Sequence, residues 1–141
     1  MIKDKPLNDS LWTIKALWIG SSLSIVEQLA LASFVKHGHR VELFTYENVK
    51  NIPEGVIIRD GREILDSTNI FMYKKKPSYS GFANWFRYEM LYKEGGVWID
   101  TDVVCLKPFD FDKDIFFIDI VNIKLNEITL VGVSVLLTGL R

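Results

Sequence analysis

The sequence contains a single cysteine and has no excess of charge of either sign. Cys105 cannot form a disulfide within the chain, which excludes the small secreted domains that depend on disulfides. Seventeen basic and eighteen acidic residues leave a formal net charge of -1. Because a nucleic-acid-binding surface needs an excess of basic residues, we expect no nucleic acid among the partners of this protein.

Long apolar runs, repeats and low-complexity segments are absent as well. No stretch reaches the ~18 consecutive apolar residues that span a bilayer, and residues 1–10 lack the apolar centre of a signal peptide. We therefore expect a cytoplasmic protein without a transmembrane segment, for which any membrane contact would be peripheral, at the inner face. The 141 residues, 48% of them hydrophobic, suffice for one domain with a buried core.

The first half of the sequence predicts a strand, a helix and a second strand. An apolar strand over residues 14–20 ends at Gly20. Ser24 and Glu27 have the spacing of a capping box at a helix start. The apolar positions that follow recur at helical spacing and predict one face of this helix: Ile25, Leu29, Ala32 and Val35. Alternating residues over 41–45 predict the second strand, so the three elements form a parallel β-α-β unit and the fold is α/β.

The second half predicts a third short strand over 56–58, a short helix over 60–67 and a long helix over 81–94. The long helix carries large apolar residues on one stripe, namely Phe82, Phe86 and Met90. The glycines at 95–96 end it, because glycine tolerates the left-handed conformation past a helix end. An apolar strand over 97–99 comes next and runs directly into an acidic pair.

The acidic pair consists of Asp100 and Asp102. In open α/β sheets, ligands bind at the carboxyl ends of the strands. A hard cation such as Mg²⁺ or Mn²⁺ is held there by one or two carboxylates together with phosphate oxygens of a substrate. Such a metal would neutralise the charge that develops on a diphosphate as a bond to it breaks. Taken alone, the pair also fits a solvated turn in which aspartate is simply favoured.

Three further residues are candidates for the same crevice. Asn84 and Arg87 are three positions apart and share one face of the long helix. An amide and a guanidinium could hold sugar hydroxyls and diphosphate oxygens, the arginine through charge-assisted hydrogen bonds. Trp18, at the end of the first strand, could stack on a base. In isolation, an exposed amide, a surface ion pair and a core tryptophan explain these residues better than a binding site does.

The run FANWFRYEMLYKEGGVWIDTDVVCLKPFDF at 82–111 resembles the signature of glycosyltransferases that carry the Asp-x-Asp sugar-nucleotide motif. Every element of that signature is present: Asn84, Arg87, Tyr88, Leu91, Gly95, Gly96, Trp98, Asp100, Asp102, Leu106 and Pro108. The resemblance begins at Trp18 and is closest to the capsule and lipopolysaccharide type and the Och-type group. A more distant likeness is to the clostridial toxin glucosyltransferases.

The resemblance implies a GT-A-like fold, which is a Rossmann-like α/β fold with a mostly parallel sheet that binds a nucleotide-diphospho-sugar. It implies a metal-assisted transfer, with Mn²⁺ or Mg²⁺, of a sugar from a donor that is most often a UDP-sugar. The acceptor would be a glycan or a lipid-linked glycan, and the pathway would be surface polysaccharide or lipopolysaccharide biosynthesis.

The resemblance also assigns roles to the candidate residues. Asp102 would bind the metal directly, while Asp100 would contact ribose and sugar hydroxyls and help to orient the metal. Asn84 and Arg87 would hold the donor sugar. Trp18 would pack on the base together with Gly20. The expected catalytic residues are therefore Asp100, Asp102 and Arg87, the substrate-binding residues are Trp18, Gly20, Asn84, Arg87 and Asp100, and the metal ligands are Asp102 and Asp100.

Residues 1–141 are expected to form a single GT-A-like domain that corresponds to the N-terminal part of this fold and lacks the acceptor-binding portion. The apolar segment 128–137 would then fold back as one or two strands. Two alternatives fit the same residues. One is a truncated nucleotide-sugar-binding remnant without turnover. The other is a haloacid-dehalogenase-type phosphatase, because VWIDTDVV at 97–104 also fits an Asp-x-Asp-x-Val pattern in which the first aspartate is the nucleophile.

Overall fold

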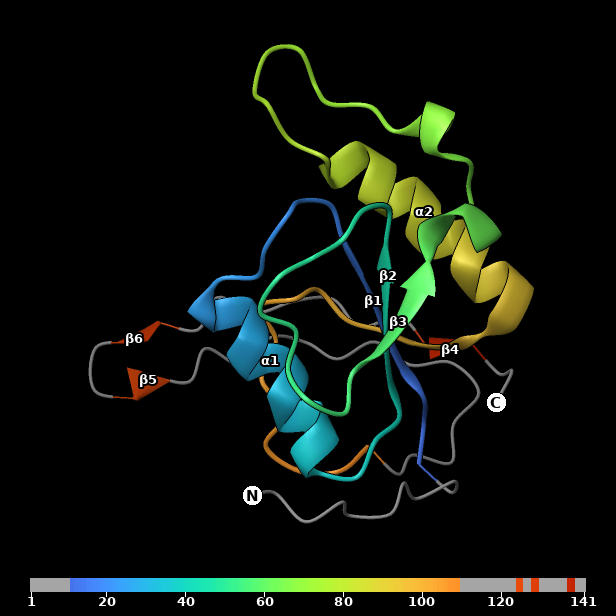
Figure 1. Ribbon diagram of the computed structural model, residues 1–141. Helices are drawn as coiled ribbons and strands as arrows, with labels where there is room; N and C mark the ends of the chain where they lie inside the picture. The colour runs from blue at the N-terminus through green and yellow to red at the C-terminus, as the bar shows by residue number, and fades with distance from the viewer. Residues whose placement is uncertain (1–10, 110–123, 126–127, 130–136, 139–141) are drawn as a thin grey trace.

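The computed structural model describes residues 11–109 and the short segments 124–125, 128–129 and 137–138. The described residues form a five-stranded sheet with one long helix on each face (Figure 1). The elements of this unit are β1 (Ile14–Trp18), α1 (Ile25–Lys36), β2 (Val41–Thr45), β3 (Ile57–Asp60), α2 (Ser80–Glu94), β4 (Gly96–Trp98) and β7 (Leu137–Thr138).

The sheet has the strand order β3-β2-β1-β4-β7. The first four of these strands are parallel to one another, and β7 runs antiparallel to β4. Figure 1 shows α1 and α2 on opposite sides of the sheet. This arrangement confirms the expected α/β fold with a mostly parallel, Rossmann-like sheet.

The start of α1 is as predicted, but its buried face is not. The capping box is present, with the backbone N–H of Ser24 donating to the carboxylate of Glu27 at 2.7 Å. However, Ile25 is 82% and Leu29 57% exposed. The residues that α1 buries are Ala30, Leu31, Ser33 and Phe34. Because most residues of α1 are apolar, their spacing alone did not distinguish its inner face from its outer face.

The predicted stripe of α2 is confirmed, since Phe82, Phe86 and Met90 are fully buried against the sheet. Gly95 ends the helix with φ of 69°, a conformation that favours glycine. β4 then enters the sheet parallel to β1. A helix that leads into a parallel strand begins at the carboxyl edge of the sheet and ends at its amino edge. The first turn of α2 therefore lies at the edge where β1 and β4 end.

The segment between β3 and α2 differs from the predicted short helix over 60–67. Two separate 3₁₀ turns, η1 (Gly61–Glu63) and η2 (Ser67–Asn69), occupy it. The carboxylates of Asp60 and Asp66 each accept a hydrogen bond, at 2.9 Å, from the backbone N–H two residues later. Each aspartate thus starts its own short turn, which interrupts a continuous helix. β3 itself begins one residue later and ends two residues later than predicted.

Two hydrophobic clusters lie on the two faces of the sheet. The cluster beneath α1 includes Ile14, Leu31, Phe34, Leu43, Val97 and Ile99. The cluster beneath α2 includes Phe44, Phe82, Phe86, Met90, Leu91 and Trp98. Both clusters draw on β1, β2 and β4 or their immediate continuations, so the central strands are covered on both sides, as a parallel sheet requires.

A network of ion pairs joins the end of α2 to the three strands β1, β2 and β3. Arg59 donates to Glu42 at 2.8 Å and to the two oxygens of Glu94 at 2.8 and 2.9 Å, with its guanidinium 4.8 Å from the centre of the Phe44 ring. Nζ of Lys15 lies 2.9 Å from the same Glu94 carboxylate. The hydrogen bond from Arg59 lowers the pKa of Glu94 to about 2. These charges are largely shielded from water, so each depends on its partners.

The described parts of the tail are strands; β6 and the start of β7 fall in the predicted segment 128–137, whereas β5 precedes it. β5 (Lys124–Leu125) and β6 (Ile128–Thr129) pair with each other antiparallel, and Leu137 of β7 lies opposite Val97 of β4. The rest of the predicted segment 128–137 lies outside the described residues. Within the part of the chain that the structure describes, no helix has both the length and the apolar character needed to cross a membrane.

Candidate functional site

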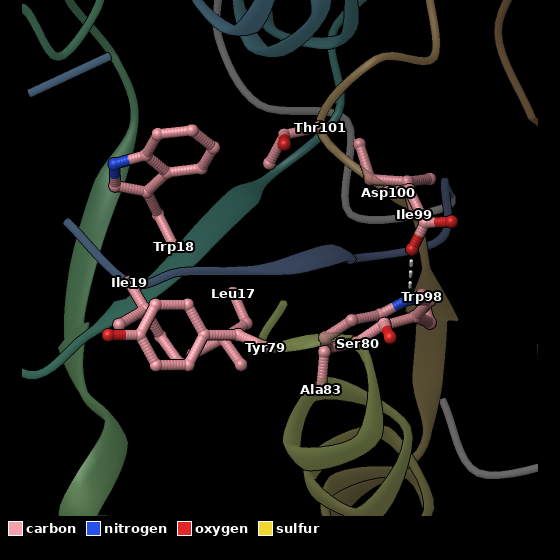
Figure 2. Close-up of a pocket in the computed structure, with 10 residues that line it drawn as sticks. All are labelled: Leu17, Trp18, Ile19, Tyr79, Ser80, Ala83, Trp98, Ile99, Asp100 and Thr101. Carbon is pink, nitrogen blue, oxygen red and sulfur yellow. Dashed lines mark hydrogen bonds between the residues drawn. The ribbon is translucent and has the colours of Figure 1, made fainter. Parts of the chain in front are cut away.

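A pocket of about 320 Å³ lies where β1 and β4 end, beside the first turn of α2 (Figure 2). β1 and β4 are neighbours in the sheet, although the chain leaves β1 toward β2 on the other side. This is the point at which the strand order reverses, where open α/β sheets bind ligands. The residues that line the pocket are Leu17, Trp18, Ile19, Tyr79, Ser80, Ala83, Trp98, Ile99, Asp100 and Thr101.

Trp18 lines one wall of this pocket, and Gly20 lies next to its indole. Nε1 of the Trp18 indole donates to the backbone oxygen of Ser22 at 3.1 Å, which fixes the ring over the loop that follows β1. Gly20 has φ of 148°, and a Cβ at this position would lie 3.2 Å from the same Nε1. The glycine thus lets the loop pass close beneath the indole. The structure therefore places Gly20 next to Trp18, but only Trp18 is among the residues that line the pocket.

The acidic pair follows β4 at the opposite wall, where Figure 2 shows Asp100 and Thr101 across from the rings of Trp18 and Tyr79. Oδ1 of Asp100 accepts a hydrogen bond from Nε1 of Trp98 at 3.0 Å. Asp102 is exposed and lies just beyond the lining residues. Neighbouring groups remove some of the water around its carboxylate, and this desolvation, followed by the nearby charges of Asp100 and Glu27, raises the pKa of Asp102 above its ordinary value. A carboxylate surrounded by like charges favours the binding of a cation.

The segment after the acidic pair is fastened to the α1 side of the molecule. The backbone N–H of Cys105 donates to Oγ of the buried Ser33 at 2.8 Å, and that of Phe109 donates to Nε2 of His39 at 2.8 Å. Nδ1 of His39 in turn lies 2.7 Å from the backbone oxygen of Trp12, to which it donates. His39 is therefore a structural histidine, held in the neutral tautomer by one donor and one acceptor.

The predicted residues of α2 are not among the pocket lining. The helix lines the pocket with Ser80 and Ala83, and Arg87 lies four positions beyond Ala83, about 6 Å along the helix. The guanidinium of Arg87 lies 5.0 Å from the centre of the Tyr88 ring, and Nη2 is 3.4 Å from its hydroxyl. Nε of Arg87 is buried without a hydrogen-bond partner among the described residues. Of the predicted residues, Trp18 and Asp100 line the pocket, whereas Gly20, Asn84, Arg87 and Asp102 are not among its lining residues.

The pocket residues at the start of α2 were not identified from the sequence: Tyr79, Ser80 and Ala83. The order of strands and helices along the chain would have identified them. A helix between two parallel strands begins at the ligand-binding edge, so its first turn borders the site before any residue farther along it does. Tyr79 is 37% exposed and supplies a second aromatic ring at the pocket. It also stands at the N-cap of α2 and makes no capping hydrogen bond through its side chain.

The acidic pair can hold a divalent metal only if a bound substrate and water supply the remaining metal ligands. Among the described residues, no group of three or more histidine, cysteine, aspartate or glutamate side chains could hold a metal ion. Asp100 and Asp102 supply the hard oxygen ligands that Mg²⁺ and Mn²⁺ prefer, and these ions commonly take the rest of their coordination from water and substrate phosphates. The donor set therefore suits a metal that binds together with a diphosphate.

Comparison with known proteins adds an independent finding. The family model described as glycosyltransferase sugar-binding region containing DXD motif matches residues 24–119, which is more than half of the 141 residues. The matched range includes both helices and the acidic pair, while Trp18 and Gly20 lie before it. No curated protein and no solved structure matched the chain. By this match the chain belongs to the family of glycosyltransferase sugar-binding regions that contain the DXD motif.

Proposed function

We propose that this protein binds a UDP-sugar in the pocket between β1 and β4 and transfers the sugar to a glycan or lipid-linked acceptor. The transfer is assisted by Mn²⁺ or Mg²⁺ and serves the biosynthesis of a surface polysaccharide or lipopolysaccharide. It takes place in the cytoplasm, at the inner face of the membrane. The family supplies the class of enzyme, and the donor, metal and pathway are the finer part of this proposal.

One observation carries the proposal, namely that aromatic rings and a carboxylate face each other across a pocket at the switch point of the sheet. A nucleotide-sugar has a flat base at one end and a hydroxyl-rich sugar at the other, joined by a diphosphate. Trp18 and Tyr79 offer flat apolar surfaces for the base. Asp100 offers a hydrogen-bond acceptor for the hydroxyl groups of ribose and sugar. The two chemistries of the pocket thus match the two ends of the donor.

The diphosphate would lie between these ends, near the start of α2. The first turn of a helix carries free N–H groups and the positive end of the helix dipole, both of which favour a phosphate. Asp102 and Asp100 would hold the metal, which when bound supplies positive charge to the departing diphosphate. Arg87 and Asn84 would reach the donor sugar from farther along α2, and the unpaired Nε of Arg87 is a donor available for that role.

Titration calorimetry with UDP-sugars tests the donor site. We expect binding in the presence of Mn²⁺ and a large loss of affinity in EDTA, because the diphosphate and the carboxylates would then repel each other. Asp102→Asn should abolish the metal-dependent part, since it removes the charge of the main metal ligand. Glu54→Gln removes one negative charge at an exposed site outside the pocket and should bind as the wild type does.

Transfer itself is tested by release of UDP from a UDP-sugar in the presence of Mn²⁺. Release by the wild type and its absence in Asp102→Asn would support the proposed reaction. Wild-type donor affinity in Asp102→Asn would contradict the role assigned to this residue. A folded wild-type protein that binds no UDP-sugar with Mn²⁺ would contradict the proposed donor site as a whole.

A further inference from the structure

The outer face of α2 carries an unusual number of exposed aromatic side chains. Trp85, Tyr88 and Tyr92 lie on one stripe of the helix and are 39%, 58% and 85% exposed. This stripe lies beside the one formed by Phe82, Phe86 and Met90, which packs on the sheet. Aromatic side chains are usually buried in a core or an interface. A row of them that faces away from the core therefore indicates a surface that binds a partner.

The loop before α2 extends this row. Phe71, Met72 and Tyr73 are 41%, 45% and 50% exposed. The Phe71 ring lies 6.0 Å from that of Tyr73 and 6.3 Å from that of Phe82, which in turn is 6.4 Å from Trp85.

Gly81, the first position of the stripe on α2, allows this close contact. A Cβ there would lie 2.5 Å from the Tyr73 hydroxyl and 2.9 Å from the Phe71 ring. The loop and the helix therefore present one continuous surface, which we call the aromatic strip and which consists of Phe71, Met72, Tyr73, Trp85, Tyr88 and Tyr92.

Positive charge accompanies the aromatic strip. Lys74, Lys75 and Lys76 are all exposed in the loop at 71–79, which Figure 1 shows extending away from the sheet beyond the first turn of α2. The 22 residues from 67 to 88 contain these three lysines and Arg87 but no aspartate or glutamate, and Glu89 is the single acidic residue in the part of α2 that the strip spans, 85–92. The protein as a whole has a net charge of -1, so this segment concentrates basic residues locally. A partner that fits it must be negatively charged and must accept aromatic rings.

We infer that the aromatic strip and the lysine loop dock on the surface of an anionic lipid membrane. Tyrosine and tryptophan favour the boundary between lipid headgroups and acyl chains, where their rings are shielded and their polar groups remain hydrated. Lysines next to them gain from the negative surface potential of anionic lipids. This inference rests on exposed side chains outside the pocket, so it stands independently of the proposed donor and reaction.

Vesicle titration of the full chain tests the inference. Vesicles of phosphatidylcholine with phosphatidylglycerol should bind the protein at low salt, whereas vesicles of phosphatidylcholine alone should bind it far more weakly. Raising the salt concentration should weaken the binding, because exposed charges are screened. Replacing Lys74, Lys75 and Lys76 with glutamine should cost about a hundredfold in vesicle affinity. The same exchange at Lys36, Lys50 and Lys107, which are exposed on the α1 side, changes the net charge equally and should cost far less.

Tryptophan fluorescence gives a second readout. Trp12 and Trp98 are each 3% exposed and Trp18 lies in the pocket, so a blue shift on adding anionic vesicles should come from Trp85. Trp85→Phe should abolish that shift while vesicle binding persists. The inference is wrong if anionic vesicles do not bind the wild type, if neutral vesicles bind equally well, or if the two triple-lysine variants lose the same affinity. An acidic protein partner would give the first of these results.

Discussion

Trp98→Phe tests whether the sheet holds the carboxylate of the pocket in place. Trp98 is 3% exposed, and its indole N–H donates to Asp100 at 3.0 Å. Phenylalanine keeps an aromatic ring beside Phe86, whose ring centre lies 6.2 Å from that of Trp98, but has no donor. A hydrogen bond to a charged group contributes roughly 1.5–3 kcal/mol. Because Asp100 is exposed and water can replace part of the bond, we use the lower end of this range.

A loss of about 1.5 kcal/mol corresponds to an affinity about tenfold weaker for a UDP-sugar with Mn²⁺, measured by titration calorimetry. Phe86→Leu is the matched control, since it disturbs the same hydrophobic cluster without touching the hydrogen bond. It should lower the stability of the protein and leave donor affinity unchanged. Wild-type affinity in Trp98→Phe would refute the reasoning, because the carboxylate would then be positioned without the indole.

Three further predictions concern the scaffold around the pocket. Arg59→Met should lower the free energy of unfolding in urea by about 3 kcal/mol at neutral pH, because Glu42 and Glu94 lose their main partner. The pKa of Glu94 in the folded protein is about 2, below its usual 4.5, so this difference should be present above pH 4.5 and should shrink as the pH falls toward 2; no difference at neutral pH would contradict it. Burial lowers the pKa of His39 below 6.5, so stability in urea should fall as the pH drops below 6.5, and His39→Gln should flatten that dependence. Burial raises the pKa of the Cys105 thiol to about 11, so iodoacetamide should modify it only after unfolding, and rapid labelling of the folded protein would contradict its packing.

The sequence was a good guide to the fold where its apolar pattern had contrast. On α2, the predicted stripe of Phe82, Phe86 and Met90 is buried and carries no hydrogen-bonding N–H or O–H group in its side chains, whereas the exposed rings of Trp85, Tyr88 and Tyr92 each carry one. On α1, apolar residues occupy nearly every face, so the predicted positions include Ile25 and Leu29, which are exposed. Periodicity identifies a buried face only when the opposite face is polar.

Of the site, only the residues at the ends of the strands could be predicted from the sequence. The positions of Trp18 and Asp100 follow from where β1 and β4 stop, and the structure places both at the pocket. Arg87 was assigned by its helical face and by the resemblance, and a shared helical face says nothing about distance along the helix axis. Tyr79 was missed because a residue before a helix carries no periodicity. The position of a residue along its helix, relative to the pocket, depends on how the helix connects to the strands of the sheet. A local sequence pattern does not contain that information.

Hydrogen bonds on both sides of the acidic pair bear on the cost of binding. Ile99 donates to the backbone of β1, and Cys105 is held by Ser33, so the turn that contains Asp100 and Asp102 is anchored at both ends. Fixing the backbone of a free residue costs about 1–2 kcal/mol. That entropy is lost when the protein folds, before any ligand arrives. Metal and diphosphate would therefore meet carboxylates that need little further ordering, and affinity would depend on charge and contact rather than on closing a loop.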